Sequence, residues 1–115
     1  MFKKPGKLDI DQQTISSIIS EGCIIDGNIN APAFVRIDGQ VKGDVTIEQG
    51  LILGEKGSIT GQVNTKQMVV YGYIEGNITA ELLEIRSTGK INGNIITGTI
   101  QVEAGAVYNG NLSMA

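Results

Sequence analysis

The apolar positions of this chain recur in a five-residue phrase: an apolar residue, a variable residue, a glycine, a polar residue and a second apolar residue. Six copies of the phrase follow one another at a nearly constant spacing, with the glycine at Gly27, Gly43, Gly61, Gly76, Gly93 and Gly110. Successive glycines are 16, 18, 15, 17 and 17 positions apart. A repeat of this length that extends over most of a chain is typical of a solenoid.

Short runs with an apolar residue at every second place lie between the phrases, for instance Phe34 to Ile37 and Ile100 to Val102. A period of two predicts β strands. At ~3.3 Å per residue, one repeat makes a closed loop on the order of 50 Å round, which suits three short faces around a thin core. Glycine suits the corner between two faces because it has no side chain. The pattern therefore predicts an all-β, single-domain, three-faced β-helix of about six turns, its strands ~4.8 Å apart.

Stacked turns would align equivalent residues in rows along the axis. The polar residues that follow the phrase glycines would form one such row, a candidate hydrogen-bonded ladder of Asn28, Asp44, Gln62, Asn77, Asn94 and Asn111. Arg36 and Asp38, two apart on one strand, are expected to share an outer face. Cys23 occupies an apolar position of the first repeat, so we expect a small buried hydrophobe there.

Composition excludes several classes of function. A length of 115 residues suits one domain, and a net charge of −3 argues against nucleic acid as the main partner. The single cysteine cannot form an internal disulfide or a thiolate metal cluster. The chain has no histidine, which β-helix acyltransferases and zinc enzymes on similar folds use. It also lacks a phosphate-binding Gly-x-x-x-x-Gly-Lys-Ser/Thr loop. We therefore expect no enzyme activity and no metal, nucleotide or other cofactor.

The first residues differ from the repeats. Residues 1–13 begin with Met1-Phe2-Lys3-Lys4-Pro5-Gly6-Lys7, a short basic stretch broken by proline and glycine, which predicts a flexible arm. No apolar stretch is long enough for a secretory signal or a bilayer span, so we expect a cytoplasmic protein. Phe2 could insert its ring into a lipid interface while Lys3 and Lys4 meet anionic head groups, which makes the arm a candidate membrane-targeting segment. Residues 14–115 would form the β-helix.

The string Arg36-Ile37-Asp38-Gly39-Gln40-Val41-Lys42-Gly43 carries a family resemblance, as does the stretch from Thr14 to Gly22. With the repeats that continue to Gly110, the chain resembles the bactofilins, which are polymer-forming bacterial cytoskeletal proteins. The resemblance implies a right-handed β-helix that polymerises end to end into non-polar filaments without nucleotide. It also implies a membrane-targeting Met-Phe-x-Lys start, matched by Met1, Phe2 and Lys4.

A β-helix presents an open strand edge and a section of its apolar core at each end. Three residues follow the last phrase, too few to cap it, so we expect another molecule to meet this end. The residues expected at the interface are Ile100, Val102, Val107, Tyr108 and Leu112 at this end, and Ile18, Ile19 and Ile24 at the other. Bactofilins commonly have an aromatic residue at the place of Tyr108, which makes Tyr108 the expected anchor. Alternatively, Tyr108 closes the core of its own subunit.

Two functions follow from these observations. The first is a self-assembling cytoskeletal scaffold on the inner face of the membrane, with client proteins that the sequence does not identify. The second is a solenoid that does not polymerise and serves as a scaffold or a ligand-binding module. The carboxylates scattered over the repeats fit solvated outward positions in either case.

Overall fold

The chain folds as one continuous coil of short β strands. The computed structural model describes residues 17–115, and every regular element in this range is a strand. The strands are β1 (Ser17–Ile19), β2 (Ile24–Asp26), β3 (Ile29–Ala31), β4 (Phe34–Ile37), β5 (Gln40–Lys42), β6 (Val45–Leu53), β7 (Ser58–Thr60), β8 (Val63–Val70), β9 (Tyr73–Glu75), β10 (Ile78–Ile85), β11 (Lys90–Asn92), β12 (Ile95–Val102), β13 (Val107–Asn109) and β14 (Leu112–Met114). Their alternating residues send every second side chain into the core.

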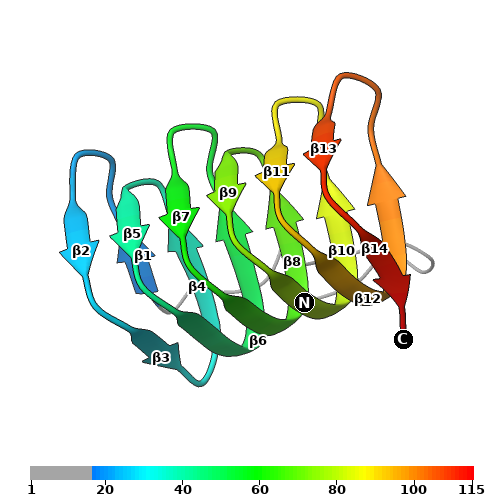
Figure 1. Cartoon of the computed structure of the whole chain (residues 1–115). Coiled ribbons are helices and arrows are strands. Elements are labelled where there is room, and N and C mark those ends of the chain that lie inside the picture. Colours follow the sequence, from blue (N-terminus) through cyan, green and yellow to red (C-terminus); the bar gives the residue numbers. More distant parts are fainter. Residues whose placement is uncertain (1–16) are drawn as a thin grey trace, which may run out of the picture.

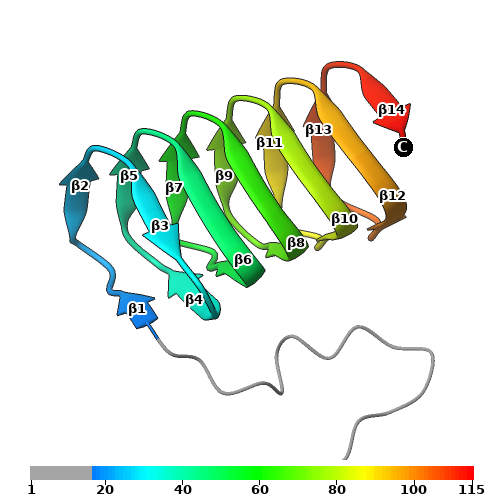
Figure 2. The same cartoon turned by 90° about the horizontal axis from the view of Figure 1, so that it is seen from below.

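Successive turns of the coil stack side by side with parallel strands (Figure 1). One sheet has the order β1-β4-β6-β8-β10-β12-β14, with β3 also paired to β6, and the other has the order β13-β11-β9-β7-β5-β2. The long strands of the first sheet curve around the coil (Figure 2), and the register of β6 against β8 shifts between Ile47 and Gly50. The long strands bend at this shift. We call their residues before the bend face 1 and those after it face 2, and we call the second sheet face 3. The predicted all-β solenoid of about six turns is confirmed; its handedness stays a prediction.

The core is built from rows of aliphatic side chains, each row taking one residue from each turn. On face 3, strand register aligns Ile25, Val41, Ile59, Ile74, Ile91 and Tyr108. The middle members of this row are at most 1% exposed. Thr65 and Thr97 are also buried in the core, and each Oγ1 donates a hydrogen bond to a backbone carbonyl two residues on, at 3.3 and 3.1 Å. These bonds satisfy the hydroxyl groups, which makes their burial tolerable.

The phrase glycines stand where face 3 turns into face 1. Gly93 has a φ of 148°, and a Cβ atom there would lie 2.1 Å from the carbonyl oxygen of Gly76 in the preceding turn. Both the backbone conformation and the close approach of the two turns therefore require glycine. The periodicity of the sequence arises from this stacking, because each turn must pass the previous one at the same corner.

Hydrogen bonds join the predicted polar row in two runs, from Asn28 to Gln62 and from Asn77 to Asn111, and each bond links a side-chain oxygen to a backbone N–H of the next turn. The Oδ1 atom of Asn28 accepts from Asp44 N at 2.9 Å, and Asp44 Oδ1 accepts from Gln62 N at 3.1 Å. In the same way, Asn94 N donates to Asn77 Oδ1 at 3.1 Å, and Asn111 N donates to Asn94 Oδ1 at 3.3 Å. The ladder thus adds bonds between turns at the corner where the glycines leave room.

Two further predictions have definite outcomes. Arg36 and Asp38 do share an outer face, with Arg36 Nε 2.9 Å from Asp38 Oδ2. The burial predicted for Cys23 is wrong, because its side chain is exposed. Cys23 lies at the end of a tight turn, where its N–H donates to Ser20 O at 3.1 Å, and this turn belongs to the first coil. The lone thiol is solvent-accessible rather than part of the core.

Candidate functional site at the two ends of the solenoid

Both ends of the coil leave strand edges open within residues 17–115. The first sheet ends at β1 on one side and β14 on the other, and the second ends at β2 and β13. Each of these strands therefore has a neighbour on one side only. Open edges of parallel strands present unpaired N–H and C=O groups, which can pair with a strand of another molecule.

At the C-terminal end, core rows stop at side chains that no further turn within residues 17–115 covers. These are Ile100 and Val102 on face 2, Leu112 and Met114 on face 1, and Tyr108 on face 3. Equivalent residues one turn earlier, such as Leu83 and Ile95, are at most 1% exposed, whereas Val102 is 55% exposed. The last turn therefore presents a section through the aliphatic core to its surroundings.

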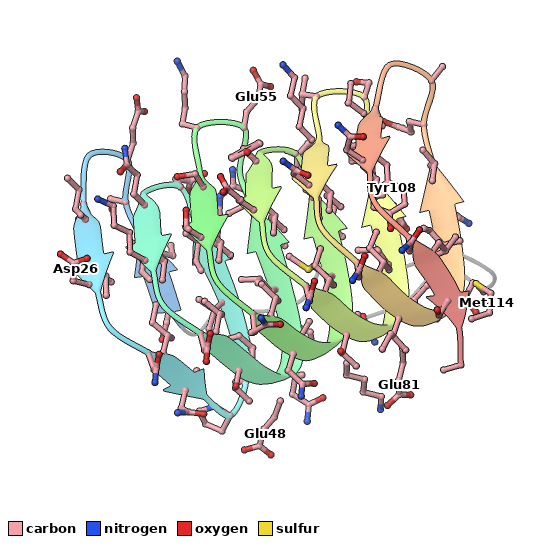
Figure 3. All side chains as sticks on the ribbon, in the orientation of Figure 1. Asp26, Glu48, Glu55, Glu81, Tyr108 and Met114 are labelled. Carbon is pink, nitrogen blue, oxygen red and sulfur yellow. The ribbon has the colours of Figure 1, made fainter. Side chains whose placement is uncertain are left out.

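Tyr108 closes part of the core of its own subunit, and its role at a polymer interface stays a prediction. Its ring packs against the core of its own subunit, and its hydroxyl donates a hydrogen bond to the backbone oxygen of Asn111. The ring remains half-buried at the open end, where Figure 3 shows it on the last short strand of face 3. Burial raises the pKa of the Tyr108 hydroxyl, and a hydrogen bond with the backbone of Ile95 opposes this shift. Tyr108 thus closes its own core in part and still offers an apolar face to a partner.

The N-terminal end is also apolar, with Ile19 packed against the core and Ile18 and Ile24 about two-thirds exposed, at 62% and 63%. Register places Ile18 beside Arg36, in an outward row of face 2. Ile24 stands beside Gln40, in an outward row of face 3. These two side chains therefore lie at the rim of the end surface rather than within the core section.

Val107 has the same kind of position at the other end. It aligns with Lys90 and Tyr73 in an exposed row of face 3, so it lies at the rim and not in the core section. Three apolar residues of the end surfaces were missed by the sequence analysis: Met114, Ile25 and Ile29. Met114 extends the face 1 row that contains Thr97 and is 56% exposed (Figure 3). Ile25 could have been found, because it heads the first phrase as Tyr108 heads the last.

The other candidate residues lie elsewhere. Met1, Phe2, Lys3 and Lys4, proposed for membrane targeting, are outside the described residues, as is the whole predicted arm 1–13. Within residues 17–115, no group of histidine, cysteine or carboxylate side chains could hold a metal ion. The described part also contains no helix long and apolar enough to cross a membrane.

Comparisons with known proteins identify the fold. A family model named Bactofilin and described as polymer-forming cytoskeletal matches residues 17–113. A cryo-EM reconstruction of Thermus thermophilus bactofilin double helical filaments contains a similar subunit, with a TM-score of 0.84 and 29% identity. That match covers 86% of this chain and 99% of the Thermus chain. The solid-state NMR structure of the cytoskeletal bactofilin BacA matches with a TM-score of 0.74 and 30% identity, over 85% of this chain and 94% of that one.

Two curated relatives come from Myxococcus xanthus. Bactofilin BacO is 28% identical over 65 residues, which are 56% of this chain, and bactofilin BacP is 25% identical over 86 residues, which are 74% of it. The matched regions span about half of BacO and about a third of BacP, at 52% and 36% of their lengths. The family match, the parallel β-solenoid and the filament-forming structural neighbours agree, and the chain belongs to the bactofilin family of polymer-forming cytoskeletal proteins.

Proposed function

We propose that this bactofilin assembles end to end into non-polar filaments that need no nucleotide, and that these filaments form a scaffold on the cytoplasmic face of the cell membrane. The observation that carries the proposal is the pair of uncovered ends. Each end combines open strand edges with apolar side chains, Ile18 and Ile24 at one and Val102, Leu112 and Met114 at the other. A second copy can satisfy both features at once, through backbone pairing and apolar burial.

The two ends of the subunit differ, so a non-polar filament needs two kinds of contact between subunits. In a non-polar filament, an N-terminal end meets another N-terminal end and a C-terminal end meets another C-terminal end. In the second of these contacts, the half-buried Tyr108 of each subunit would pack against the facing core section. Aromatic residues contribute strongly to interfaces because one ring buries a large area with little loss of conformational freedom.

Assembly without nucleotide or metal is supported by the chemistry available. Residues 17–115 contain no metal-binding cluster, and the repeated glycines precede strands rather than a helix N-terminus, where phosphates bind. Packing and strand pairing would then drive polymerisation. The alternative, a solenoid that does not polymerise, would leave the apolar side chains of both ends in water.

Membrane association would come from the N-terminal arm. Burying the Phe2 ring contributes ~1.5–3 kcal/mol, and each of Lys3 and Lys4 adds ~1 kcal/mol near an anionic surface. One arm alone would bind weakly. A filament carries many arms, so the combined binding would be far stronger, and assembly and membrane binding would reinforce each other.

The experiment that tests the assembly is negative-stain microscopy and sedimentation of the purified full chain, dialysed against a chelator without ATP or GTP. We expect filaments under these conditions. A requirement for nucleotide or metal would contradict the independence of assembly from cofactors. A monomer whose sedimentation does not change with concentration would contradict polymerisation itself and favour the alternative scaffold.

A further inference from the structure

The outer surface of face 2 carries an apolar patch that is buried although it points away from the core. Arg36, Ile52 and Val69 form one row by strand register, and their neighbours along each strand fill the core. Ile52 is 2% exposed and Val69 is 0% exposed, as little as the core itself. Phe34 and Tyr71 pack against these two residues. We call Phe34, Ile52, Val69 and Tyr71 the outer patch.

Such burial is unusual for an outward position in a single-layered coil. Side chains on the outer face of a sheet remain in solvent unless another layer covers them. Ile52 gains no side-chain cover along its own chain, because its neighbours on the outer face, two residues away on either side, are Gly50 and Gly54. The outer patch thus has the properties of a surface with a second layer packed on it.

Charged pairs frame the outer patch on both sides. Arg36 is paired with Asp38 on the N-terminal side. On the other side, Arg86 bonds Glu84 at 2.9 Å and stands over the Tyr71 ring, with its Cζ atom 5.4 Å from the ring centre. These pairs limit the apolar surface to a short strip along the row.

We propose that the segment 1–16 of the same chain docks on the outer patch. β1 lies at the head of the row, where Ile18 pairs with Arg36, so the segment joins the solenoid on face 2 itself. Ile18 and Val69 are separated by three turns, about 14 Å at ~4.8 Å per turn, a span of about four or five extended residues. The segment is therefore long enough to reach across the outer patch.

The composition of the segment fits the patch. Leu8, Asp9, Ile10 and Asp11 alternate between apolar and acidic residues. In an extended conformation, both apolar side chains point to one side and both carboxylates to the other. Leu8 and Ile10 can thus pack on Ile52 and Val69, in the manner of a strand laid over a sheet face.

Docking has a consequence for assembly. A segment laid along face 2 runs toward the middle turns and away from the end surface that contains Ile18 and Ile24. The N-terminal end then stays free for contact with another subunit. The inference does not depend on the proposed filament or on membrane binding, because its test measures only the cover over the outer patch.

The test is thiol labelling of the full chain at a reporter cysteine. Cys23→Ser removes the native thiol, and Val69→Cys places a thiol in the outer patch. The rate of labelling by iodoacetamide is compared among three chains that carry this reporter. The first altered chain also has Leu8→Asp and Ile10→Asp, and the matched control has Gln12→Asp and Gln13→Asp; the third chain has neither pair. Both altered chains gain two charges in the same segment, but only the first loses apolar contacts. We expect labelling to be about tenfold faster or more in the first, and unchanged in the control.

A second reporter, Ile52→Cys, repeats the measurement in case Val69→Cys perturbs the fold. Thr79→Cys is a control for general reactivity: Thr79 is exposed on face 1, so this thiol should be labelled equally fast in all chains. Slow labelling of the outer patch in all three chains would overturn the proposal, because the cover would then not depend on Leu8 and Ile10. Rapid labelling in the unaltered chain would overturn it as well. Protection that rises with protein concentration would assign the cover to a second copy and would also contradict docking within one chain.

Discussion

Tyr108 lies directly beyond Ile91 in one row of face 3, yet Ile91 is 1% exposed whereas Tyr108 is only half-buried. The two residues occupy the same position of successive turns and both face the core. They differ because a further turn covers Ile91 and none in residues 17–115 covers Tyr108. The contact that Tyr108 lacks in its own subunit is the one that a filament neighbour would supply.

Replacement of Tyr108 by arginine should block assembly while leaving the coil folded. A charge on each of two facing ends would have to be buried without a partner, which costs about 3–5 kcal/mol. Tyr108 lies in the last turn and packs only on the end of the core, so the turns farther inside should remain intact. We therefore expect a β-rich, cooperatively unfolding protein that sediments as a monomer or a small oligomer.

Tyr108→Phe is the matched control, since it keeps the ring and removes only the hydroxyl group; it should polymerise. Circular dichroism and thermal unfolding check the fold of both variants, and sedimentation checks their assembly. If Tyr108→Arg unfolds, the ring serves mainly the core of its own subunit. Normal filaments from this variant would place the contact elsewhere, and Ile18, Ile19 and Ile24 would be the next residues to replace.

Alkaline pH should weaken the filaments through the same residue. Burial holds the pKa of Tyr108 above its ordinary value of 10.0, so the neutral hydroxyl is favoured in the folded state. The stability linked to this shift is complete below pH 10 and is lost as pH rises through the folded pKa. Ionisation would also place two negative charges at the facing ends, and filaments should dissociate there.

Tyr108→Phe filaments should persist to higher pH than the wild type, because phenylalanine cannot ionise. Tyr73→Phe is the control, because Tyr73 is exposed on face 3 and its hydroxyl donates a hydrogen bond to the nearby Glu75 carboxylate at 3.2 Å. Light scattering during an alkaline titration measures the midpoint. Identical midpoints for wild type and Tyr108→Phe would contradict a role for Tyr108 ionisation.

Gly93→Ala should destabilise the coil more than Gly27→Ala. Both glycines have a positive φ, 148° and 131°, so alanine strains the backbone at either place by about 1–3 kcal/mol. Only at Gly93 would the new Cβ also collide with the preceding turn, 2.1 Å from Gly76 O; at Gly27 nothing lies within 4 Å. Denaturant unfolding separates the two effects. Equal losses of stability would mean that the turns can move apart at this corner.

Phe2→Glu should weaken membrane binding without affecting assembly. The substitution removes an apolar ring and adds a charge that anionic lipids repel, whereas Lys3 and Lys4 remain. Co-sedimentation with anionic liposomes measures the binding, with Gln12→Glu as a control that adds the same charge farther along the chain. Filament formation is checked separately by microscopy. Equal lipid binding by all three proteins would exclude Phe2 as a membrane anchor.

The sequence by itself determined the repeat, the strands and the corners of the coil. These features follow from local rules: alternation places side chains in or out of the core, and a corner crossed at every turn keeps its glycine. The same rules predicted the pairing of Arg36 with Asp38 and the polar row from Asn28 to Asn111. The apolar character of both ends also follows, because every core row must stop somewhere.

Tertiary structure alone decided which side chains are covered. Cys23 is exposed because it lies in the tight turn of the first coil, and Val107 is at the rim because register aligns it with Lys90. In the sequence, Ile52 and Val69 of the outer patch lie within continuous apolar runs. Only the strand register shows that these two residues lie outside the core. Burial depends on what the neighbouring turn or another segment contributes, and a pattern along one strand contains no information about that layer.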